Sequence, residues 1–560
     1  MEQKLLQIRT FREPETKQVA EKPVMDSLST NRQNSGINDF NVMLISVQPN
    51  TDIIGIKYLH AYLQKNDINS RILILPYYRK EMNGAIREFF GEHKPNLVGI
   101  GVLSEEFTTA EKLIQFLKSE YDFATFMGGH QATIDPERCL KYVDYVLKGE
   151  SEDSLLEVCQ KMKRGESFLS TPSLVYKKDN KIVKNPLRRP EENLDKYPFI
   201  EFLPEETYIF HRDSIRKMDD FLFRKYSRYN GRFYSLTTTR GCNFKCSFCI
   251  HSFTDKMYTE ENMNIPRIRT RSVDNVMEEL RHMKSNYPDT VYVNIQDDNF
   301  FAHDIAWLKE FSEKYKKDIA LPIVLRAIPI WFTEEKARVL KECGLTWVFS
   351  GLQTGSQRIQ RDIYQRPISN EQFLKTADII NKMNFCAYYD VILDNPLETE
   401  EDVLQTIDVI LKIKKPYQLQ LLSLTFFPGT VIYDIAKERG MDVDDPFSKN
   451  FYGLKNTYLN KIVRLIPLLP SSFVRFLIKV RKKKAAKMAL PLVYYPTIFT
   501  IEPLTWLRLI LKSFNGSIKK TYKMVRSFAL LGIKQIMFKR PASYHTHWFS
   551  NVKNRIVKLT

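Results

Sequence analysis

Short apolar runs alternate with amphipathic segments in two long stretches of the chain, and this alternation restricts the fold more than any other feature. In the first stretch, the expected strands and helices are 41–46, 54–66, 71–75, 82–93, 96–102, 107–119 and 124–129. Buried strands that alternate with helices at this spacing are typical of a doubly wound parallel sheet. The first stretch therefore predicts a Rossmann-like α/β domain.

Ligands bind to such sheets beyond the carboxyl ends of the strands. Here those ends are residues 47–50, 103–106 and 128–132. Gly128 and Gly129 stand at the last of them. Paired glycines let the backbone approach a flat ligand more closely than any residue with a Cβ would allow. The sequence thus places a binding site at this edge of the first domain.

The second stretch contains six further strand-and-helix units. Its expected strands are 234–239, 290–296, 322–328, 347–353, 387–393 and 419–427. In one of the intervening helices, Val276, Met277, Leu280 and Met283 fall on a single face. Six such units predict a partial (βα)6 TIM-like barrel, with its active site at the carboxyl ends of the strands.

Polar or turn-forming residues follow or end five of these six strands, and one lies within the third. They are Cys242 to Cys249, Asp297 to Asn299, Arg326, Gln353 to Ser356, Asp394 to Pro396 and Pro428 to Thr430. Any one of these groups alone is explained by a turn or a helix cap. Six groups at one rim favour a functional site there.

The segment GCNFKCSFC holds Cys242, Cys246 and Cys249 within eight residues. Three soft thiolates at this spacing can hold one metal centre. A closed zinc site needs a fourth protein ligand, which His251 could supply. A 4Fe-4S cluster held by three cysteines keeps one iron open instead. The spacing is unusual for a zinc finger and no second cysteine pair follows, which favours the cluster.

This C-x3-C-x-aromatic-C motif, after the β-rich run SLTTTRG, resembles the signature of the radical S-adenosylmethionine superfamily. The resemblance implies that the open iron binds the amino and carboxylate groups of S-adenosylmethionine and reduces it to a 5′-deoxyadenosyl radical. It also implies an electron donor such as flavodoxin or ferredoxin.

Further motifs resemble the same family: DD-x-F after a strand, a G-L-x-x-G-S turn, a P-x-E-T-x-E-D helix start and P-G-T. The resemblance places these residues near S-adenosylmethionine: Phe248, Asp297, Asp298, Arg326, Gln353, Ser356 and Asp394. Arg326, Gln353 and Ser356 would lie near the nucleoside, and Asp297 or Asp298 near the methionine amino group. Many relatives have Glu at the position of Gln353, which weakens the expected ribose contact there, and Gly-x-Pro-Gly in place of residues 394–397. No residue is singled out as catalytic.

The first stretch also carries segments that look like the cobalamin-binding domain found ahead of many radical S-adenosylmethionine modules. They are GIKYLHAYL, PNLVGIGVLS, GGHQATIDPE and YVLKGESEDSLLEV. The residues that this resemblance implies for cobalamin are Ser104, Gly128, Gly129, His130, Thr133, Gly149 and Glu150. The motif D-x-H-x-x-G, which supplies a histidine ligand in the mutases, is absent. His130 could bind cobalt, but a single loop histidine is more often a polar surface group.

The remaining cysteines, Cys139, Cys159, Cys343 and Cys386, are scattered. They do not form the pattern of a disulfide framework, which favours a reducing, cytoplasmic setting. They also provide no second iron-sulfur motif, which argues against sulfur insertion. The first 40 residues are polar, so we expect no signal peptide and a disordered segment over 1–37.

Residues 451–560 differ from the rest of the chain, because they contain 22 Lys and Arg but only one acidic residue, Glu502. Aromatic and aliphatic residues are mixed with these cations, and several prolines interrupt the segment. No charge-free run reaches the roughly 18 to 20 residues of a spanning helix. Such a segment suits peripheral contact with the inner face of a membrane. Packing over the barrel is almost as well supported, whereas nucleic acid is less so, because no recognisable nucleic-acid module accompanies the charge.

These features predict a disordered segment (1–37), a cobalamin-binding domain (38–165), a connector (166–230), a radical S-adenosylmethionine domain (231–445) and a basic, mostly helical C-terminal region (446–560). The resemblance implies hydrogen abstraction from an unactivated carbon of a small or lipid-like substrate, followed by methyl transfer from methylcobalamin. Three alternatives remain open: a cobalamin-assisted cyclase or oxidoreductase, a tRNA-modifying enzyme, and a zinc-stabilised binding protein without activity.

Overall fold

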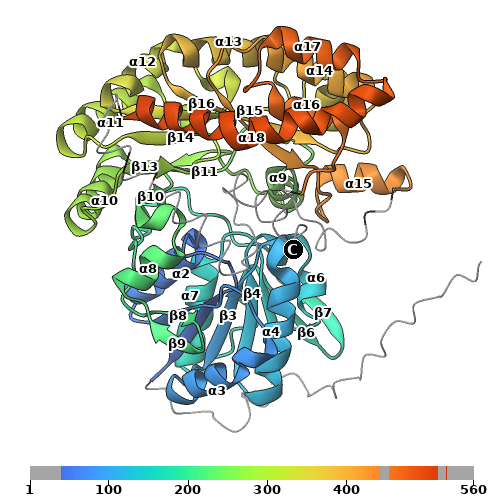
Figure 1. The fold of residues 1–560 in the computed structure, drawn as a ribbon. Helices are drawn as coiled ribbons and strands as arrows, with labels where there is room; N and C mark the ends of the chain where they lie inside the picture. The colour runs from blue at the N-terminus through green and yellow to red at the C-terminus, as the bar shows by residue number, and fades with distance from the viewer. Residues whose placement is uncertain (1–38, 442, 444–452, 515–521, 523–524, 526–560) are drawn as a thin grey trace, which may run out of the picture.

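The computed structural model describes residues 39–441, 443, 453–514, 522 and 525. Two α/β domains lie one above the other, and helices from the C-terminal region lie against the second domain (Figure 1). The segment 1–37, for which we expect disorder, lies outside the described residues.

The first domain is built on a nine-stranded sheet in the order β7-β6-β5-β4-β3-β1-β2-β8-β9. Its strands are β1 (Asn41–Ser46), β2 (Asn69–Ile74), β3 (Leu97–Gly101), β4 (Ala124–Gly128), β5 (Tyr145–Leu147), β6 (Leu174–Lys178), β7 (Lys181–Lys184), β8 (Thr207–His211) and β9 (Ser214–Lys217). Its helices are α2 (Ile54–Lys65), α3 (Asn83–Glu92), α4 (Phe107–Glu120), α5 (His130–Ile134), α6 (Pro136–Cys139), α7 (Glu152–Lys163) and α8 (Asp220–Tyr226), with short 3-10 turns η1 (Lys80–Met82), η2 (Ser104–Glu106), η3 (Leu194–Lys196) and η4 (Arg228–Gly231). The parallel core β5-β4-β3-β1-β2 confirms the predicted doubly wound sheet.

The segment 166–230, expected to be a connector that begins with a hairpin around Asp179 and Asn180, adds strands to both edges of this sheet. Strands β6 and β7 extend one edge as an antiparallel hairpin, whereas β8 and β9 extend the other. The hairpin turns at Asp179 and Asn180, as expected, and both residues have positive φ, as a tight two-residue hairpin turn requires. The two edge strands β7 and β9 are short and largely exposed, so their sequences lack the apolar runs that mark the central strands.

The second domain contains a six-stranded sheet in the order β10-β13-β14-β15-β16-β17, with every neighbouring pair parallel. Its strands are β10 (Phe233–Leu236), β13 (Tyr292–Ile295), β14 (Ile323–Ala327), β15 (Leu345–Gln353), β16 (Cys386–Leu393) and β17 (Gln418–Ser423), beside a small ribbon of β11 (Thr239–Arg240) and β12 (Arg269–Thr270). Its helices are α9 (Ile250–Glu260), α10 (Val273–Asn286), α11 (Ile305–Asp318), α12 (Glu334–Cys343), α13 (Asn370–Lys382), α14 (Glu400–Leu411) and α15 (Val431–Glu438), with η5 (Phe300–Ala302), η6 (Pro329–Trp331) and the π-helix η7 (Ile359–Ile363). All six strands of the predicted partial barrel are present.

A buried ion pair fixes the first unit of this barrel. Arg271, which follows β12, contacts Glu279 of α10 at 2.5 Å between Nη1 and Oε2, and both side chains are almost fully buried. The hydroxyl of Tyr234 in β10 donates to the same carboxylate at 2.9 Å. Because these groups come from a ribbon, a helix and a strand, the pair holds together three elements near the start of the barrel.

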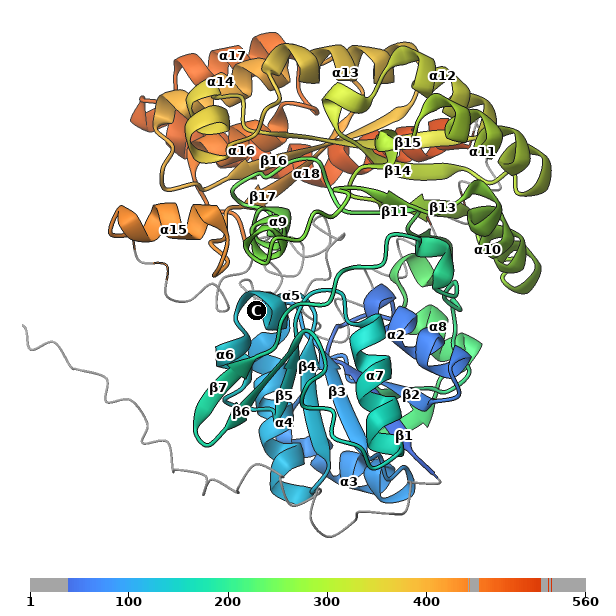
Figure 2. The same ribbon diagram turned by 180° about the vertical axis from the view of Figure 1, so that it is seen from behind.

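The C-terminal region forms three helices, α16 (Tyr458–Leu465), α17 (Ser471–Lys479) and α18 (Lys484–Ser513). Helix α18 continues through Pro491, Pro496 and Pro503, although we expect prolines to break this segment into short helices. Packing explains the difference, because Leu509 and Ile510 lie against apolar residues near the starts of the central barrel strands. Figures 1 and 2 show α18 crossing this side of the second domain.

None of the helices in the described part of the chain is sufficiently long and apolar to cross a membrane. This agrees with the sequence, in which charges interrupt every apolar run of the C-terminal region.

The buried pair gives a test of this fold. Replacing Arg271 by Met leaves the Glu279 carboxylate buried without a cation, so we expect the unfolding free energy of the second domain to fall by about 3–5 kcal/mol. Replacing Arg338 by Met, whose partner Glu334 lies on the surface of α12, is the matched control and should cost less than about 1 kcal/mol. Urea unfolding followed by tryptophan fluorescence measures both. Equal losses would show that the buried pair has no special role.

Candidate functional site

The carboxyl ends of the strands of both domains meet at one cavity of about 690 Å³. The first domain contributes, among others, Gly128, Gly129, His130, Thr133, Gly149 and Glu150, and the second contributes Cys242, His251, Gln296 and Asp298. Helix α9 lies between the two sheets in both views (Figures 1 and 2). The cavity therefore combines residues that we expected at a cysteine-bound centre with residues that we expected at a second cofactor.

The cysteine loop, residues 241–249, runs from strand β11 to helix α9. It begins at Gly241, whose φ is 101°. A Cβ at this position would lie 2.1 Å from the carbonyl oxygen of Arg267, so only glycine fits. The loop therefore leaves the ribbon at one fixed angle, which presents Cys242 to the cavity.

Ser247 anchors the middle of the cysteine loop to the end of η7. Its backbone N–H donates to the carbonyl of Tyr364 at 2.9 Å, and its hydroxyl donates to the carbonyl of Ile363 at 2.5 Å. The backbone N–H of Ile432 in turn donates to the Ser247 carbonyl at 3.0 Å. Three bonds at one residue fix the loop between its cysteines, a function that the sequence motif alone does not reveal.

The thiols of the loop are suited to a metal centre. Burial raises the pKa of Cys242 to about 11 and that of Cys249 to about 12, so both thiols are protonated at neutral pH without a metal. The guanidinium of Arg366 donates to the sulfur of Cys246 at 3.8 Å. Binding of soft metal ions would release these protons. Three thiols on one pinned loop fit an iron-sulfur cluster.

His251, considered as a fourth zinc ligand, bonds to Asp298 instead, with 2.9 Å between Nε2 and Oδ2. Burial lowers the pKa of His251, but the bond to Asp298 and its charge outweigh burial and raise it. Within the described residues, no three His, Cys, Asp or Glu side chains, the loop cysteines included, are placed to bind a single metal ion such as zinc.

His130 faces the cavity from the start of α5. Burial lowers its pKa, the charge of Asp298 raises it, and that of His251 lowers it further, so that the net shift is downward. A neutral imidazole at this place can donate or accept a hydrogen bond, or bind a metal. The charge of Asp298, in the second domain, thus acts on His130, in the first.

Glycines form much of the first-domain wall. Gly129 and Gly149 have φ values of 94° and 72°, and a Cβ at either would approach a neighbouring oxygen to within 3 Å. Thr133 joins the two glycine loops, because its hydroxyl donates to the Gly129 carbonyl at 2.9 Å and accepts from the Gly149 N–H at 3.0 Å. Ser104 is buried at the start of η2 and is not part of the cavity wall. The wall presents backbone to a flat ligand, which fits a corrin.

Glu150 has a role that the sequence did not suggest. Its carboxylate accepts from Arg240 and Arg269 of the second-domain ribbon, each with an Nη1 to Oε2 distance of 3.0 Å. Glu152 also pairs with Arg240, at 2.7 Å. The two arginines lower the pKa of Glu150 despite its burial. This charge cluster joins the two domains beside the cavity, and only the structure brings Arg240 and Arg269 to it.

The two adjacent aspartates after β13 have different environments. Asp297 is fully buried and accepts hydrogen bonds from the backbone N–H groups of Thr238 and Thr239, at 2.6 and 3.1 Å. Burial raises its pKa to about 6, although these bonds oppose the shift. Asp298 is exposed to the cavity. Of the two, Asp298 is therefore placed to contact a ligand, whereas Asp297 joins the first two barrel strands.

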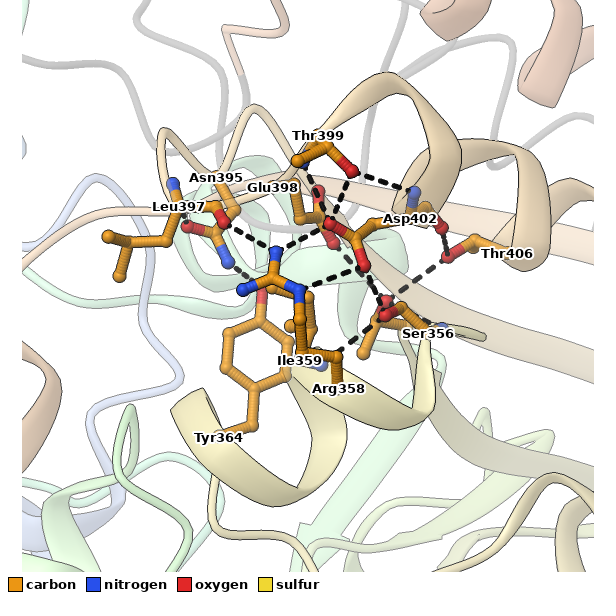
Figure 3. A network of polar contacts seen from close by, with 11 residues as sticks. Ser356, Arg358, Ile359, Tyr364, Asn395, Leu397, Glu398, Thr399, Asp402 and Thr406 are labelled. Carbon is orange, nitrogen blue, oxygen red and sulfur yellow. Dashed lines mark hydrogen bonds and ion pairs between the residues drawn. The ribbon is translucent and has the colours of Figure 1, made fainter.

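Ser356 belongs to a polar network that connects the end of β15 with the start of α14 (Figure 3). Its hydroxyl donates to Asp402 at 2.5 Å, and Arg358 donates to the other oxygen of the same carboxylate at 2.5 Å. Thr399 caps α14 through a capping box with Asp402. These bonds lower the pKa of Asp402 despite its desolvation. The G-L-x-x-G-S and P-x-E-T-x-E-D motifs thus hold each other and support η7.

Phe248 and Asp394, which we also expected near S-adenosylmethionine, contact other parts of the protein. Phe248 packs edge-to-face on Tyr364, with 5.0 Å between the ring centroids. Asp394 accepts from the Lys455 N–H and the Asn460 side chain, at 2.8 and 2.7 Å, and so holds the C-terminal region. Neither residue lines the cavity between the domains.

Arg326 and Gln353 lie on β14 and β15. Gln353 has a φ of 66°, and its buried Oε1 has no hydrogen-bond partner within the described residues. Asp390 on the neighbouring strand β16 has an equally unpaired Oδ1, and burial raises its pKa to about 6 against the attraction of Arg326 and Arg366. Unpaired buried acceptors call for a ligand with donor groups, and the hydroxyl and amino groups of a nucleoside fit them. The sequence did not single out Asp390.

Two family models match the chain. Residues 236–410 match the radical SAM superfamily, and residues 41–159 match the B12 binding domain. The two matches correspond to the second and first domains and meet across the cavity.

Among curated proteins, an uncharacterized methyltransferase of Pyrococcus horikoshii is 26% identical over 364 residues, which is 63% of this chain and 71% of that protein. The tRNA-2-methylthio-N(6)-dimethylallyladenosine synthase of Acetivibrio thermocellus is 23% identical over 247 residues, and the match covers 41% of this chain and 49% of that enzyme.

Two solved structures share the fold. The radical S-adenosylmethionine methyltransferase TsrM from Kitasatospora setae superposes with a TM-score of 0.57 at 19% identity, over 71% of this chain and 76% of that one. The cobalamin-dependent S-adenosylmethionine radical enzyme OxsB superposes with a TM-score of 0.60 at 12% identity, over 93% and 84% of the two chains. With its two matched domains, its cysteine loop and its glycine-lined wall, the chain belongs to the radical SAM superfamily, in the group whose members carry a cobalamin-binding domain.

Proposed function

We propose that this enzyme methylates an unactivated carbon of a small or lipid-like substrate, using a 4Fe-4S cluster, S-adenosylmethionine and cobalamin. The single observation that carries the proposal is the shared cavity, in which Cys242 and the glycine-lined wall face each other across the domain boundary. When bound, the cluster and S-adenosylmethionine supply radical chemistry, and cobalamin supplies a methyl group. The relatives named as methyltransferases support this choice of reaction.

The residues of the chain have separate tasks in this proposal. Cys242, Cys246 and Cys249 would hold the cluster, and Arg366, which donates to the Cys246 sulfur at 3.8 Å, would balance its negative charge. Asp298 would accept a hydrogen bond from the methionine amino group, while Gln353 and Arg326 would contact the nucleoside. Their unpaired or exposed polar atoms suit these tasks.

The first domain would hold cobalamin against the glycine wall formed by Gly128, Gly129 and Gly149. Thr133 keeps the two glycine loops at a fixed separation, and His130 offers a neutral imidazole to the ligand. The buried ion pairs of Glu150 close one side of the cavity and help to keep water away from the reacting carbon. Ser104, which lies away from the wall, would support the loop after β3 indirectly.

The partners of the reaction belong to the same proposal. A small electron-transfer protein such as flavodoxin or ferredoxin would reduce the cluster. The basic C-terminal region would bring the enzyme to the inner face of a membrane, which suits a lipid-like substrate. Nucleic acid is disfavoured as substrate, because the matches to the tRNA-modifying enzymes span less than half of the chain.

Metal analysis tests both cofactors at once. After anaerobic reconstitution with iron, sulfide and hydroxocobalamin, we expect about four iron atoms and about one cobalt per chain. Replacing Cys242, Cys246 and Cys249 by Ala should remove the iron and leave the cobalt, because the two cofactors have separate walls.

A triple Ala variant at the buried cysteines Cys139, Cys343 and Cys386 is the matched control and should keep both metals. Zinc in place of iron, or iron retained without the loop cysteines, would contradict the cluster assignment.

Gly128 allows a test of the cobalamin wall that does not strain the backbone. A Cβ at this position would lie 4.0 Å from its nearest neighbour, so the fold should accept Val, but the side chain would occupy ligand space. We expect Gly128→Val to weaken cobalamin binding about tenfold or more. Gly84→Val, on a helix with no atom near its Cβ, should bind normally. Equilibrium dialysis with hydroxocobalamin measures both, and unchanged binding by the first variant would place cobalamin elsewhere.

Methyl transfer itself is tested with S-adenosylmethionine deuterated at its methyl group, offered with extracted small molecules and lipids as substrate. We expect one extracted compound to gain the label with the reconstituted enzyme and not with the triple loop variant. A product that changes mass without carrying deuterium would instead indicate ring closure or oxidation. Mass spectrometry separates these results.

A further inference from the structure

Large apolar side chains are exposed mainly on helices α17 and α18. Eleven large apolar residues are exposed in the described part of the chain, and eight of them fall between positions 473 and 522. On α18 the most exposed of them are Leu492, Met488 and Leu504, with 78%, 71% and 63% of their surface accessible. Scattered exposed apolar residues need no explanation, but such clustering on two neighbouring helices indicates a contact surface.

Cations surround these apolar side chains. Besides Arg475, which pairs with Asp408 of α14, the exposed basic residues are Lys479, Lys482, Lys483, Lys484, Lys487 and Arg508. None of the six forms an ion pair with another residue that the structure describes. Within α17 and α18 the acidic residue is Glu502, which is buried and pairs with Arg464 at 3.0 Å. The surface therefore offers positive charge that no neighbouring carboxylate on these two helices neutralises.

The side chains on the exposed side of α18 do not pack into the core of the protein. The opposite side carries Leu490, Tyr494 and Ile498, which pack into the core, and Leu509 and Ile510, which pack near the starts of the barrel strands. We call the exposed side, together with the free end of α17, the docking face, comprising Phe473, Phe476, Met488, Leu492, Phe499, Leu504, Leu507 and the six cations above. Figure 1 shows α18 lengthwise across the outside of the second domain, with α16 and α17 at one end.

We propose that the docking face binds the surface of an anionic lipid bilayer, with α18 lying in the plane of the membrane. Apolar side chains would enter the boundary between headgroups and acyl chains, while lysines would meet the lipid phosphates. The inference names the surface behind the membrane contact in the proposed function, but it does not depend on methyl transfer.

The composition of the docking face favours lipid over single-stranded RNA. RNA-binding grooves combine cations with aromatic rings on which bases stack. Here the most exposed apolar residues, Met488, Leu492 and Leu504, are aliphatic. Such side chains gain free energy from hydrocarbon, whereas a polynucleotide offers them little.

Two variants of the full chain test the proposal. One replaces Met488, Leu492 and Leu504 by Ser, and the other replaces Lys483, Lys484 and Lys487 by Gln. The expected result is that the wild type cosediments with phosphatidylcholine vesicles containing about one-third phosphatidylglycerol, and that each variant binds at least about tenfold more weakly. High salt should weaken wild-type binding too, since part of the attraction is electrostatic.

The matched control carries Phe221→Ser, Lys316→Gln and Lys317→Gln, exposed residues of the same kinds on α8 and α11. It should bind vesicles like the wild type. Circular dichroism and the iron and cobalt contents of all variants should match the wild type, which separates this test from the proposed chemistry.

Three results would overturn the proposal. One is equal vesicle binding by the wild type and both variants. Another is tighter binding to a single-stranded RNA than to vesicles, lost in the lysine variant but kept in the serine variant. The third is a change from dimer to monomer in light scattering, without any loss of vesicle binding, which would make the docking face a contact between copies of the chain.

Discussion

A partly buried cluster of four charges holds the two halves of this enzyme in register. Glu150 and Glu152 enter it from the first domain, and Arg240 and Arg269 enter it from the ribbon of the second. Because Arg240 directly precedes Gly241, the same residue that contacts the first domain also sets where the cysteine loop begins. The separation of the two cofactor walls therefore depends on the geometry of these ion pairs. A buried pair of this kind contributes little net stability but is costly to break on one side, which suits a role in positioning.

The cysteine loop depends on a second support, from the far side of the barrel rim. Asp402 holds Ser356 and Arg358, which directly precede η7, and the carbonyls at the far end of η7 hold Ser247 in the middle of the loop. Some motif residues that could be taken for cofactor contacts thus hold other parts of the protein in place. Ser356 and Asp297 act in this way, whereas Asp298 and Gln353 retain free or exposed polar atoms toward the interior.

The sequence predicted the strands that are marked by runs of buried apolar residues. All six barrel strands and the central strands of the first domain lie where buried runs occur. It failed for β9, whose residues carry no such pattern, and for α18, where packing against the barrel outweighs three prolines. At the site, the sequence predicted the three cysteines and the glycines, and the structure brings Cys242 and these glycines to one cavity. It could not separate Asp297 from Asp298, because adjacent residues at the end of a strand differ only in the direction in which their side chains point. It also did not single out Arg240 or Asp390.

The hairpins that extend the first sheet also determine how other proteins can approach it. Both outermost strands, β7 and β9, are short and antiparallel to their neighbours, and each carries lysine at its end, at Lys181, Lys184 and Lys217. Charged, short edge strands resist pairing with a strand from another chain. Partners that bind by strand addition are therefore disfavoured at the two edges of this sheet. The same edges protect the parallel core from edge-to-edge aggregation.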